Sequence, residues 1–354
     1  MDLALDLARH GAGRTSPNPA VGAVVVREGE IVGRGFHTWS GVKHAEIVAL
    51  SEAGERARGS TAYVTLEPCS HHGRTGPCAD ALIEAGVARV VAAMEDPNPD
   101  VRGKGFEHLR AFGVEVEMAH EYADAAGRIN EAFIHAMRTG RPLVTLKAAL
   151  TLDGKIAAGR GDTGWITSEE ARAHAQTLRH FSDAILTGIG TVLADDPLLT
   201  DRTGTERSRP LLRIVLDSKL RIPLGSRMVD SARDDLVIFT SSAADAERRE
   251  ELERRGVRVV DGGLDAVIEY LARDKYRSLL IEAGAGVNGS ALDAGLVDKI
   301  FFYYAPKILG GLDSLPVVGG AGHSLSDAVR LERLTLHNIG ADEFAVEAYV
   351  HRNH

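Results

Sequence analysis

One histidine and two cysteines, His44, Cys69 and Cys78, place the strongest constraint on how this chain can fold. An imidazole and two thiolates are ligands that Zn²⁺ prefers, and three protein ligands leave one coordination position open for water. The fold must then bring these three side chains together. Glu46 follows His44 by two residues and is suited to moving protons beside the metal. The sequence therefore predicts a catalytic zinc site.

Two other interpretations of these residues stay open. Cys69 and Cys78 could form a surface disulfide or be two buried thiols, with His44 only capping a helix. Each cysteine follows a proline, and Pro77 would fit the first turn of a helix that begins near Cys78. The pattern H-x-E followed by P-C-x-x-C is typical of zinc deaminases that act on bases, although the spacing of the two cysteines is wider here. We favour zinc because all the elements of that pattern occur in order.

The composition limits the class of protein. A chain of 354 residues is long enough for two domains. Its net charge of −9 and lack of a basic run argue against a nucleic-acid partner. Two cysteines, both in the predicted site, indicate a reducing compartment. No signal-like or membrane-spanning apolar run is present, so we expect a cytoplasmic enzyme without a membrane partner.

Apolar strands alternate with helical segments in both halves of the chain, which predicts α/β domains with helices on both faces of a sheet. The segment 139–142 is the expected linker, so that residues 1–140 and 141–354 form the two domains. Strands at 299–304 and 345–351 are expected to be antiparallel. The expected helices include 2–11, 44–56, 78–85, 122–138, 168–181 and 244–255.

Gly284, Gly286 and Gly289 form a G-x-G-x-x-G run after a predicted strand and before a helix expected at 291–294. Backbone amides in such a run can hold a pyrophosphate. The run comes late in the chain and lacks the acidic residue expected about 20 positions later, so a tight turn remains an alternative. Ser218 could donate to a 2′-phosphate, whereas Asp217 would repel one unless its side chain is turned away.

Polar residues in the loops around the predicted zinc site are candidate substrate contacts, although Asn and Asp beside Pro are also common in turns. Two arginines of the second half could bind a substrate phosphate or be ordinary surface residues. The loop residues are Asn18, His71, Arg74, Asp96 and Asn98, and the arginines are Arg179 and Arg202.

These residues resemble the bifunctional deaminase–reductases of riboflavin biosynthesis over nearly the whole chain. In the first half the shared motifs are S-P-N-P-A-V-G at 16–22, H-A-E at 44–46, the E-P-C to P-C loop at 67–78 with its wide cysteine spacing, and D-P-N-P at 96–99. In the second half they are Lys147 with T-L-D-G-K at 151–155, W-I-T-S at 165–168, T-V-L-A-D-D-P at 191–197 and E-A-G-A-G-V-N-G-S at 282–290.

The resemblance implies a cytidine-deaminase-like α/β/α sandwich followed by a dihydrofolate-reductase-like α/β domain. The first domain would deaminate 2,5-diamino-6-ribosylamino-4(3H)-pyrimidinone 5′-phosphate, and the second would reduce the ribosyl group to ribityl with NADPH. A homo-oligomer is also implied. In the family's roles His44, Cys69 and Cys78 bind zinc and Glu46 shuttles protons. The NADPH site would comprise Ala149, Trp165, Thr191, Asp195, Ser218, Gly284, Ala285, Gly286, Val287, Asn288, Gly289 and Ser290. Contacts to the sugar phosphate would come from Thr163, Arg179, Leu199, Arg202 and Glu282.

Two rival functions follow from the same residues. One is a nucleic-acid base deaminase with an appended binding domain, which the acidic net charge opposes. The other is a non-catalytic binding protein built on a degraded enzyme, which the intact ligand set and Glu46 oppose.

Overall fold

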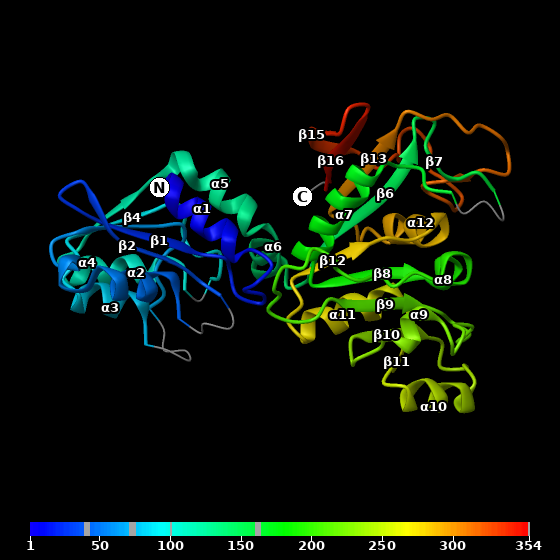
Figure 1. Ribbon diagram of the computed structural model, residues 1–354, viewed down its shortest axis with the longest axis horizontal. Coiled ribbons are helices and arrows are strands. Elements are labelled where there is room, and N and C mark those ends of the chain that lie inside the picture. The colour runs from blue at the N-terminus through cyan, green and yellow to red at the C-terminus, as the bar shows by residue number, and fades with distance from the viewer. Residues whose placement is uncertain (39–42, 71–75, 100, 160–163, 353–354) are drawn as a thin grey trace. The chain divides into compact units, whose positions relative to one another are not determined.

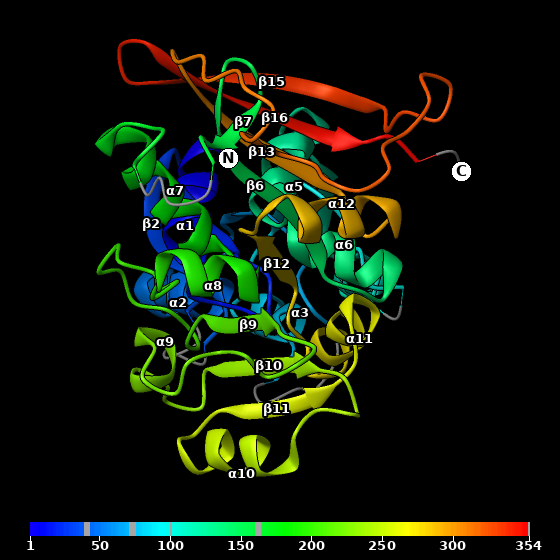
Figure 2. The ribbon, with the colours of Figure 1, turned by 90° about the vertical axis from the view of Figure 1, so that its right-hand side faces the viewer.

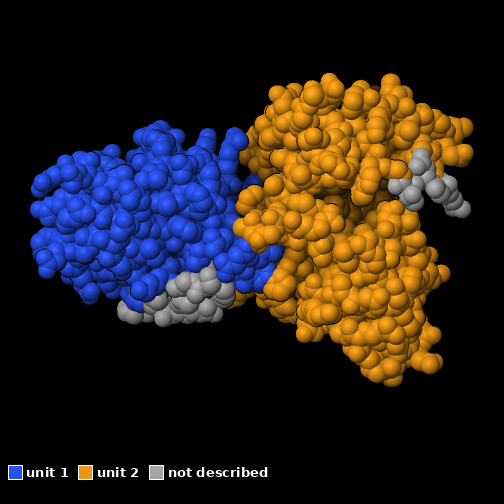
Figure 3. All heavy atoms as spheres, viewed as in Figure 1, with its two compact units in different colours: residues 1–141, 206–209 blue, residues 142–205, 210–354 orange. Residues whose placement is uncertain are grey.

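The computed structural model describes residues 1–38, 43–70, 76–99, 101–159 and 164–352. The chain forms two compact units, which Figure 3 shows in different colours. Unit 1 comprises residues 1–141 and 206–209, and unit 2 comprises residues 142–205 and 210–354. No helix in the described part of the chain is long and apolar enough to cross a membrane.

Unit 1 is built on a five-stranded sheet with the order β2-β1-β3-β4-β5. The strands are β1 (Gly22–Arg27), β2 (Glu30–Phe36), β3 (Thr61–Val64), β4 (Arg89–Ala92) and β5 (Glu115–Met118). β1 is antiparallel to both β2 and β3, whereas β3, β4 and β5 are parallel.

Helices cover both faces of this sheet, so the expected three-layer α/β/α sandwich is confirmed (Figure 1). One face carries α2 (Ala45–Ala53), α3 (Cys78–Glu84) and α4 (Lys104–Ala111); the other carries α1 (Asp2–Gly11) and α5 (Ala123–Ile129). The remaining helical segments are η1 (Gly54–Ala57), η2 (His120–Tyr122) and α6 (Glu131–Thr139). Glycines let the helices lie close to the sheet: a Cβ on Gly22 would be 1.9 Å from the Ala4 carbonyl oxygen, and one on Gly33 would be 2.1 Å from that of Ala49.

The prediction of a single helix over 122–138 is wrong, because the segment forms two helices, α5 and α6, that are separated at Asn130. The buried Asn130 side chain accepts a hydrogen bond from the Ala20 amide at 2.7 Å and donates one to the Ala20 carbonyl at 2.9 Å. The helix therefore breaks where Asn130 binds a distant part of the chain. The same two hydrogen bonds hold the backbone of Ala20, two residues after Asn18.

Unit 2 is built on a nine-stranded sheet with the order β11-β10-β9-β8-β12-β6-β13-β16-β15. All nine strands are labelled in Figure 1, and Figure 2 shows most of them in a view turned by 90°. In this spatial order, the neighbouring strands from β11 through β6 to β13 all run parallel. β16 is antiparallel to both β13 and β15, so the expected antiparallel arrangement of 299–304 and 345–351 is confirmed. The strands are β6 (Leu143–Thr151), β8 (Ala184–Gly188), β9 (Leu212–Leu216), β10 (Leu236–Thr240), β11 (Arg258–Asp261), β12 (Ser278–Ile281), β13 (Lys299–Ala305), β15 (Leu331–Ile339) and β16 (Glu343–Val350). A separate small sheet pairs β7 (Lys155–Ala157) with β14 (Leu315–Pro316).

Helices cover both faces of the parallel strands. One face carries α7 (Glu169–Phe181), α8 (Ile189–Asp195), α9 (Arg227–Asp230) and α10 (Ala246–Arg254); the other carries α11 (Leu264–Arg273) and α12 (Ala285–Asp293). Because β8 and β12 are adjacent and parallel, the helices that follow them, α8 and α12, begin at the same edge of the sheet. Ligands of open α/β sheets bind at this carboxyl edge.

The sequence-based assignment of unit 2 needs correction at the glycine run. Instead of a loop before a helix at 291–294, α12 begins at Ala285 with Gly284 as its N-cap. Gly289 serves packing, since a Cβ there would lie 2.3 Å from the Gly319 carbonyl oxygen. The helices α8, α9 and α11 and the strand β15 were not predicted.

Candidate functional site

The three predicted zinc ligands converge at one point in unit 1. His44 is the N-cap of α2, Cys78 is the first residue of α3, and Cys69 lies in the segment after β3. His44 Nδ1 is 3.1 Å from Cys78 Sγ and 3.5 Å from Cys69 Sγ, and all three ligand atoms lie within 4.8 Å of one another. Both cysteines are free thiols, so the disulfide alternative is wrong.

These distances fit a zinc ion. Tetrahedral zinc with bonds of about 2.0–2.3 Å places a nitrogen and a sulfur ligand about 3.6 Å apart. The donor set of one imidazole and two sulfurs leaves one coordination position for a reactant.

The two thiols differ in their surroundings. The Cys78 amide at the start of α3 donates to Cys69 Sγ over 3.3 Å. A hydrogen bond from the Cys78 thiol lowers the pKa of Cys69 to about 4, with further help from His44 and that amide against the effect of burial. The Cys69 sulfur and burial raise the pKa of Cys78. These surroundings favour the thiolate form at Cys69, and binding of a metal ion would remove the proton from Cys78.

Glu46 lies in the first turn of α2 and is almost fully buried beside the ligands. Burial and the nearby Cys69 raise its pKa to about 7, opposed by weaker effects that include a hydrogen bond with Cys78. A carboxyl group with a pKa near neutrality can both accept and return a proton. Its position and environment thus suit proton transfer, and its role as proton shuttle stays a prediction.

His37 is a site residue that the sequence analysis missed. Its ring packs edge-on against that of His44, with centroids 5.3 Å apart. Nδ1 donates to the Lys43 carbonyl over 2.9 Å, which leaves Nε2 to accept from the Asn18 side-chain amide at 3.4 Å. Asn18 is thereby brought next to the metal ligands. The one sequence signal is a histidine directly after the segment 30–36, which forms β2.

Asp96 and Asn98 lie in the loop between β4 and α4. The Asp96 amide is bound by the Glu67 carboxylate at 3.1 Å, and Glu67 is two residues from Cys69. The Asp96 carboxylate in turn accepts from the Asn98 amide at 2.8 Å. The predicted contacts His71 and Arg74 lie outside the described residues.

In unit 2, Glu282 is the centre of a buried charge cluster just beyond β12. Its carboxylate accepts two hydrogen bonds from Arg179, at 2.8 and 2.9 Å, and one from Lys147 at 3.3 Å. Burial opposes its ionisation, but the two cations prevail and lower the pKa of Glu282 to about 2. Arg179 also donates to the Thr200 carbonyl, so its guanidinium is occupied by the protein. Lys147 was noted as part of a motif, but it was not predicted to be a site residue.

Several predicted NADPH-binding residues gather at the carboxyl edge of the sheet. Gly284 caps α12, and Thr191 lies in the first turns of α8. The two helix starts are adjacent, because a Cβ on Gly284 would be 4.0 Å from Thr191 Oγ1. Two helix N-termini at one point provide amides for a phosphate group. Buried Asn288 has a side-chain oxygen without a hydrogen-bond partner among the described residues.

Asp217 and Ser218 are neighbours in the chain but differ in burial. Ser218 is exposed just after β9, whereas Asp217 is buried and accepts from the Ile222 amide at 2.8 Å. The carboxylate therefore faces the protein interior, and Ser218 as a contact of the 2′-phosphate stays a prediction.

The other predicted residues of unit 2 are dispersed over several elements. Ala149 lies on β6, Asp195 ends α8, Leu199 is buried in the loop after α8, and Arg202 is exposed in the same loop. Trp165 is 74 % exposed, with the Arg172 guanidinium over its ring. Ala285, Gly286, Val287, Gly289 and Ser290 lie in α12. Thr163 lies outside the described residues.

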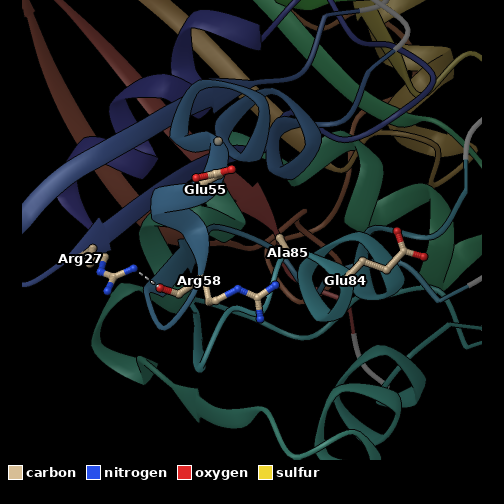
Figure 4. Close-up of a pocket in the computed structure, with 6 residues that line it drawn as sticks. Arg27, Glu55, Arg58, Glu84 and Ala85 are labelled. Atoms are coloured by element: carbon tan, nitrogen blue, oxygen red, sulfur yellow. Dashed lines mark hydrogen bonds between the residues drawn. The ribbon is translucent and has the colours of Figure 1, made fainter.

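A charged surface depression elsewhere in unit 1 is lined by Arg27, Glu55, Arg58 and Glu84 (Figure 4). Arg27 donates to the Arg58 carbonyl over 2.6 Å, and the two glutamates are exposed. None of the predicted site residues lines this depression, so we do not associate it with either reaction.

Comparison with known proteins assigns both halves. Residues 142–343 match the family described as RibD C-terminal domain, and residues 1–94 match the cytidine and deoxycytidylate deaminase zinc-binding region. The chain is 43% identical to the riboflavin biosynthesis protein RibD of Escherichia coli strain K12, over 97% of this chain and 96% of that protein. It is 42% identical to RibD of Bacillus amyloliquefaciens, over 97% of this chain and 93% of that protein.

Solved structures agree with these sequence matches. RibD of Acinetobacter baumannii, form 1, superposes with a TM-score of 0.90 at 36% identity, covering 99% of this chain and 98% of that chain. A Thermotoga maritima structure described as a diaminohydroxyphosphoribosylaminopyrimidine deaminase/5-amino-6-(5-phosphoribosylamino)uracil reductase gives 0.85 at 36% identity, covering 99% and 97%. The fold expected from the sequence is confirmed.

Proposed function

This chain belongs to the RibD family of riboflavin-biosynthesis proteins, and from that premise we propose which residues carry out its reactions and on which substrate. It is a bifunctional enzyme that combines a zinc-dependent deaminase with an NADPH-dependent reductase. Residues 1–140 would carry the deaminase and residues 141–354 the reductase. The observation that carries this proposal is the convergence of His44, Cys69 and Cys78 beside the buried Glu46.

The deaminase would act on 2,5-diamino-6-ribosylamino-4(3H)-pyrimidinone 5′-phosphate. Zinc held by the three ligands supplies a water activated for attack at neutral pH. Glu46 would accept one proton of this water as the water oxygen adds to the amino-bearing ring carbon, and would return that proton to the adjacent ring nitrogen. It would then take the remaining proton of the added hydroxyl and deliver it to the departing amino group, so that the carbon–nitrogen bond breaks, ammonia leaves and a carbonyl forms. Asn18, Asp96 and Asn98, with His71 and Arg74, would bind the base and its ribose phosphate.

The reductase would transfer a hydride from NADPH to C1′ of the open-chain imine of the ribosylamine. The starts of α8 and α12 would hold the cofactor through their amides, with Ser218 at the 2′-phosphate. Glu282 is held ionised by Lys147 and Arg179 and would present fixed charge to the polar sugar chain. Arg202 would bind the substrate phosphate, since its side chain is exposed and forms no ion pair with another described residue.

A small-molecule substrate, rather than RNA or DNA, is consistent with the net charge of −9. The two free cysteines would be preserved in a reducing compartment, which supports the cytoplasm. We also propose a homo-oligomer. Its support is β15, an edge strand of nine residues on which Leu331, Leu334 and Leu336 are exposed. Such an edge is a surface for association with another chain.

The test supplies the diaminopyrimidine phosphate and follows ammonia release, then NADPH absorbance. Glu46→Gln should keep zinc and abolish ammonia release, while NADPH oxidation with the deaminated substrate continues at the normal rate. Arg202→Ala should raise the KM for that substrate far more than the KM for NADPH. Substantial ammonia release by Glu46→Gln would refute the assigned proton shuttle. RNA retention that falls steeply with salt would instead favour the nucleic-acid deaminase.

A further inference from the structure

Glu67 is a buried carboxylate that the two reactions described above do not use. It lies just beyond β3 and two residues before Cys69, with 3 % of its surface exposed. Among the described residues, its two oxygens accept three backbone hydrogen bonds: Oε2 from the Asp96 amide at 3.1 Å and the Gly103 amide at 3.0 Å, and Oε1 from the Gly105 amide at 2.9 Å. All three donors lie in the loop between β4 and α4 or in the first turn of α4.

The Glu67 carboxylate binds backbone amides near both ends of the loop between β4 and α4. The first amides of a helix have no partner within the helix, and a negative charge there also stabilises the helix dipole. Gly103 is the N-cap of α4 and Gly105 lies in its first turn, so Glu67 caps α4 from another part of the chain. At the other end of the loop Glu67 holds Asp96, whose carboxylate holds the Asn98 amide.

The chain is shaped to allow this contact. Gly103 has a φ of 78°, a left-handed conformation that favours glycine. A Cβ on Gly105 would lie 2.0 Å from the Pro68 carbonyl oxygen, so only glycine lets α4 begin directly against the segment that carries Cys69. The three backbone N–H donors also require that both terminal atoms of residue 67 be hydrogen-bond acceptors. A glutamine side chain has only one oxygen, so its NH₂ group would face a backbone N–H.

We propose that Glu67 is a positioning residue of the deaminase: it holds the loop between β4 and α4 so that Asp96 and Asn98 meet the substrate beside the zinc ligands. This inference rests on the substrate contacts proposed for those two residues. Glu67 itself touches neither substrate nor metal in this role. It acts through the backbone that it binds.

The test compares Glu67→Gln with wild type in the full-length, zinc-loaded chain. We expect the deaminase KM to rise and kcat/KM to fall about 10- to 100-fold, as for other residues that orient a metal site. Zinc content and reductase kcat/KM should stay at the wild-type level. The matched control is Glu52→Gln, which removes an exposed carboxylate that accepts from the Arg34 amide at 2.7 Å and pairs with the Arg34 guanidinium at 3.6 Å. It should leave both activities unchanged.

A double-mutant cycle with Asp96→Asn separates positioning from general destabilisation. If Glu67 acts through Asp96, the double variant should be little worse than the more impaired single variant, because coupled residues are not additive. If the fold-losses in deaminase kcat/KM of Glu67→Gln and Asp96→Asn instead multiply in the double variant, the two residues act independently and the inference is overturned. If Asp96→Asn and Asn98→Ala leave the KM unchanged, the proposed substrate contacts fail. If those variants raise the KM but Glu67→Gln does not, only the positioning role fails.

Gly103→Ala keeps the inference testable if Glu67→Gln does not fold. It strains the backbone that donates to Glu67, while its new Cβ would meet nothing within 4 Å. Gly113, just after the end of α4, has a φ of 81° and equally open space, so Gly113→Ala imposes the same strain without touching the Glu67 contact. We expect Gly103→Ala to raise the deaminase KM well above that of Gly113→Ala. Equal KM values for the two variants would overturn the inference.

Discussion

Replacing Glu282 with glutamine should destabilise unit 2 because it removes the buried carboxylate that pairs with two buried cations, Lys147 and Arg179. The side chains of Glu282, Lys147 and Arg179 are only 10 %, 15 % and 12 % exposed. The pKa of Glu282 falls from an ordinary 4.5 to about 2, and that difference corresponds to about 3 kcal/mol of folding free energy at neutral pH. Breaking a buried ion pair by removing one partner costs about 3 to 5 kcal/mol. We expect a loss within that range at pH 7.

The pH dependence of this contribution has a defined sign. Because the pKa of Glu282 is lower in the folded chain, its stabilisation is complete above pH 4.5 and is lost as the pH falls towards about 2. The gap in unfolding free energy between wild type and Glu282→Gln should therefore be constant near neutrality. It should narrow progressively between pH 4.5 and 2.

Calorimetric unfolding of the full-length chain measures this gap, with the unit 2 transition identified in wild type by its shift on adding NADPH. Glu332→Gln is the control: it removes a carboxylate from an ion pair with His351 in which both side chains are nearly half exposed. Exposed pairs contribute at most about 1 kcal/mol, so this variant should unfold close to wild type. A Glu282→Gln variant as stable as Glu332→Gln, or a gap that does not change down to pH 2, would refute the reasoning.

Three further predictions concern the metal site, the sheet and the oligomer. Cys78→Ser, or treatment with a chelator, should abolish ammonia release while NADPH oxidation with the deaminated substrate continues; parallel loss of both would contradict separate sites. Gly22→Ala should lower the melting temperature of unit 1 strongly, because its Cβ would lie 1.9 Å from the Ala4 carbonyl oxygen, whereas Gly127→Ala, whose Cβ would make only an ordinary contact with the Ile134 side chain at 3.9 Å, should change it little. Leu336→Asp should reduce the molar mass measured by light scattering, since it places charge on the exposed face of β15; an unchanged mass would exclude this face from the interface.

The zinc ligands could be identified from the chain because their chemistry is carried by residue type and order. A histidine, a glutamate two residues later and two proline-preceded cysteines permit few other uses. The α/β class was equally accessible, since period-2 and period-3.6 patterns alternate along both halves. The resemblance to a known family then supplied most of the remaining candidate residues.

What the sequence misjudged depended on contacts between distant residues. Asn130 reads as part of a continuous helix, yet its bonds to Ala20 accompany a break there. The glycines after β12 suggest a loop, but Gly289 sits inside a helix because α12 must approach Gly319 closely. The sequence left the orientation of Asp217 open, and nothing local to this residue indicates that its carboxylate accepts from the Ile222 amide.

By itself, the sequence determined which atoms can bind zinc and move a proton, because coordination and acidity belong to the side chains. Only the tertiary structure decided where those side chains stand. The convergence of His44 with both cysteines, the pairing of Glu282 with Lys147 and Arg179, and the capping of α4 by Glu67 all join residues far apart in the chain. Such contacts are selected by the burial of the whole sheet and its helices, which no short stretch of sequence specifies.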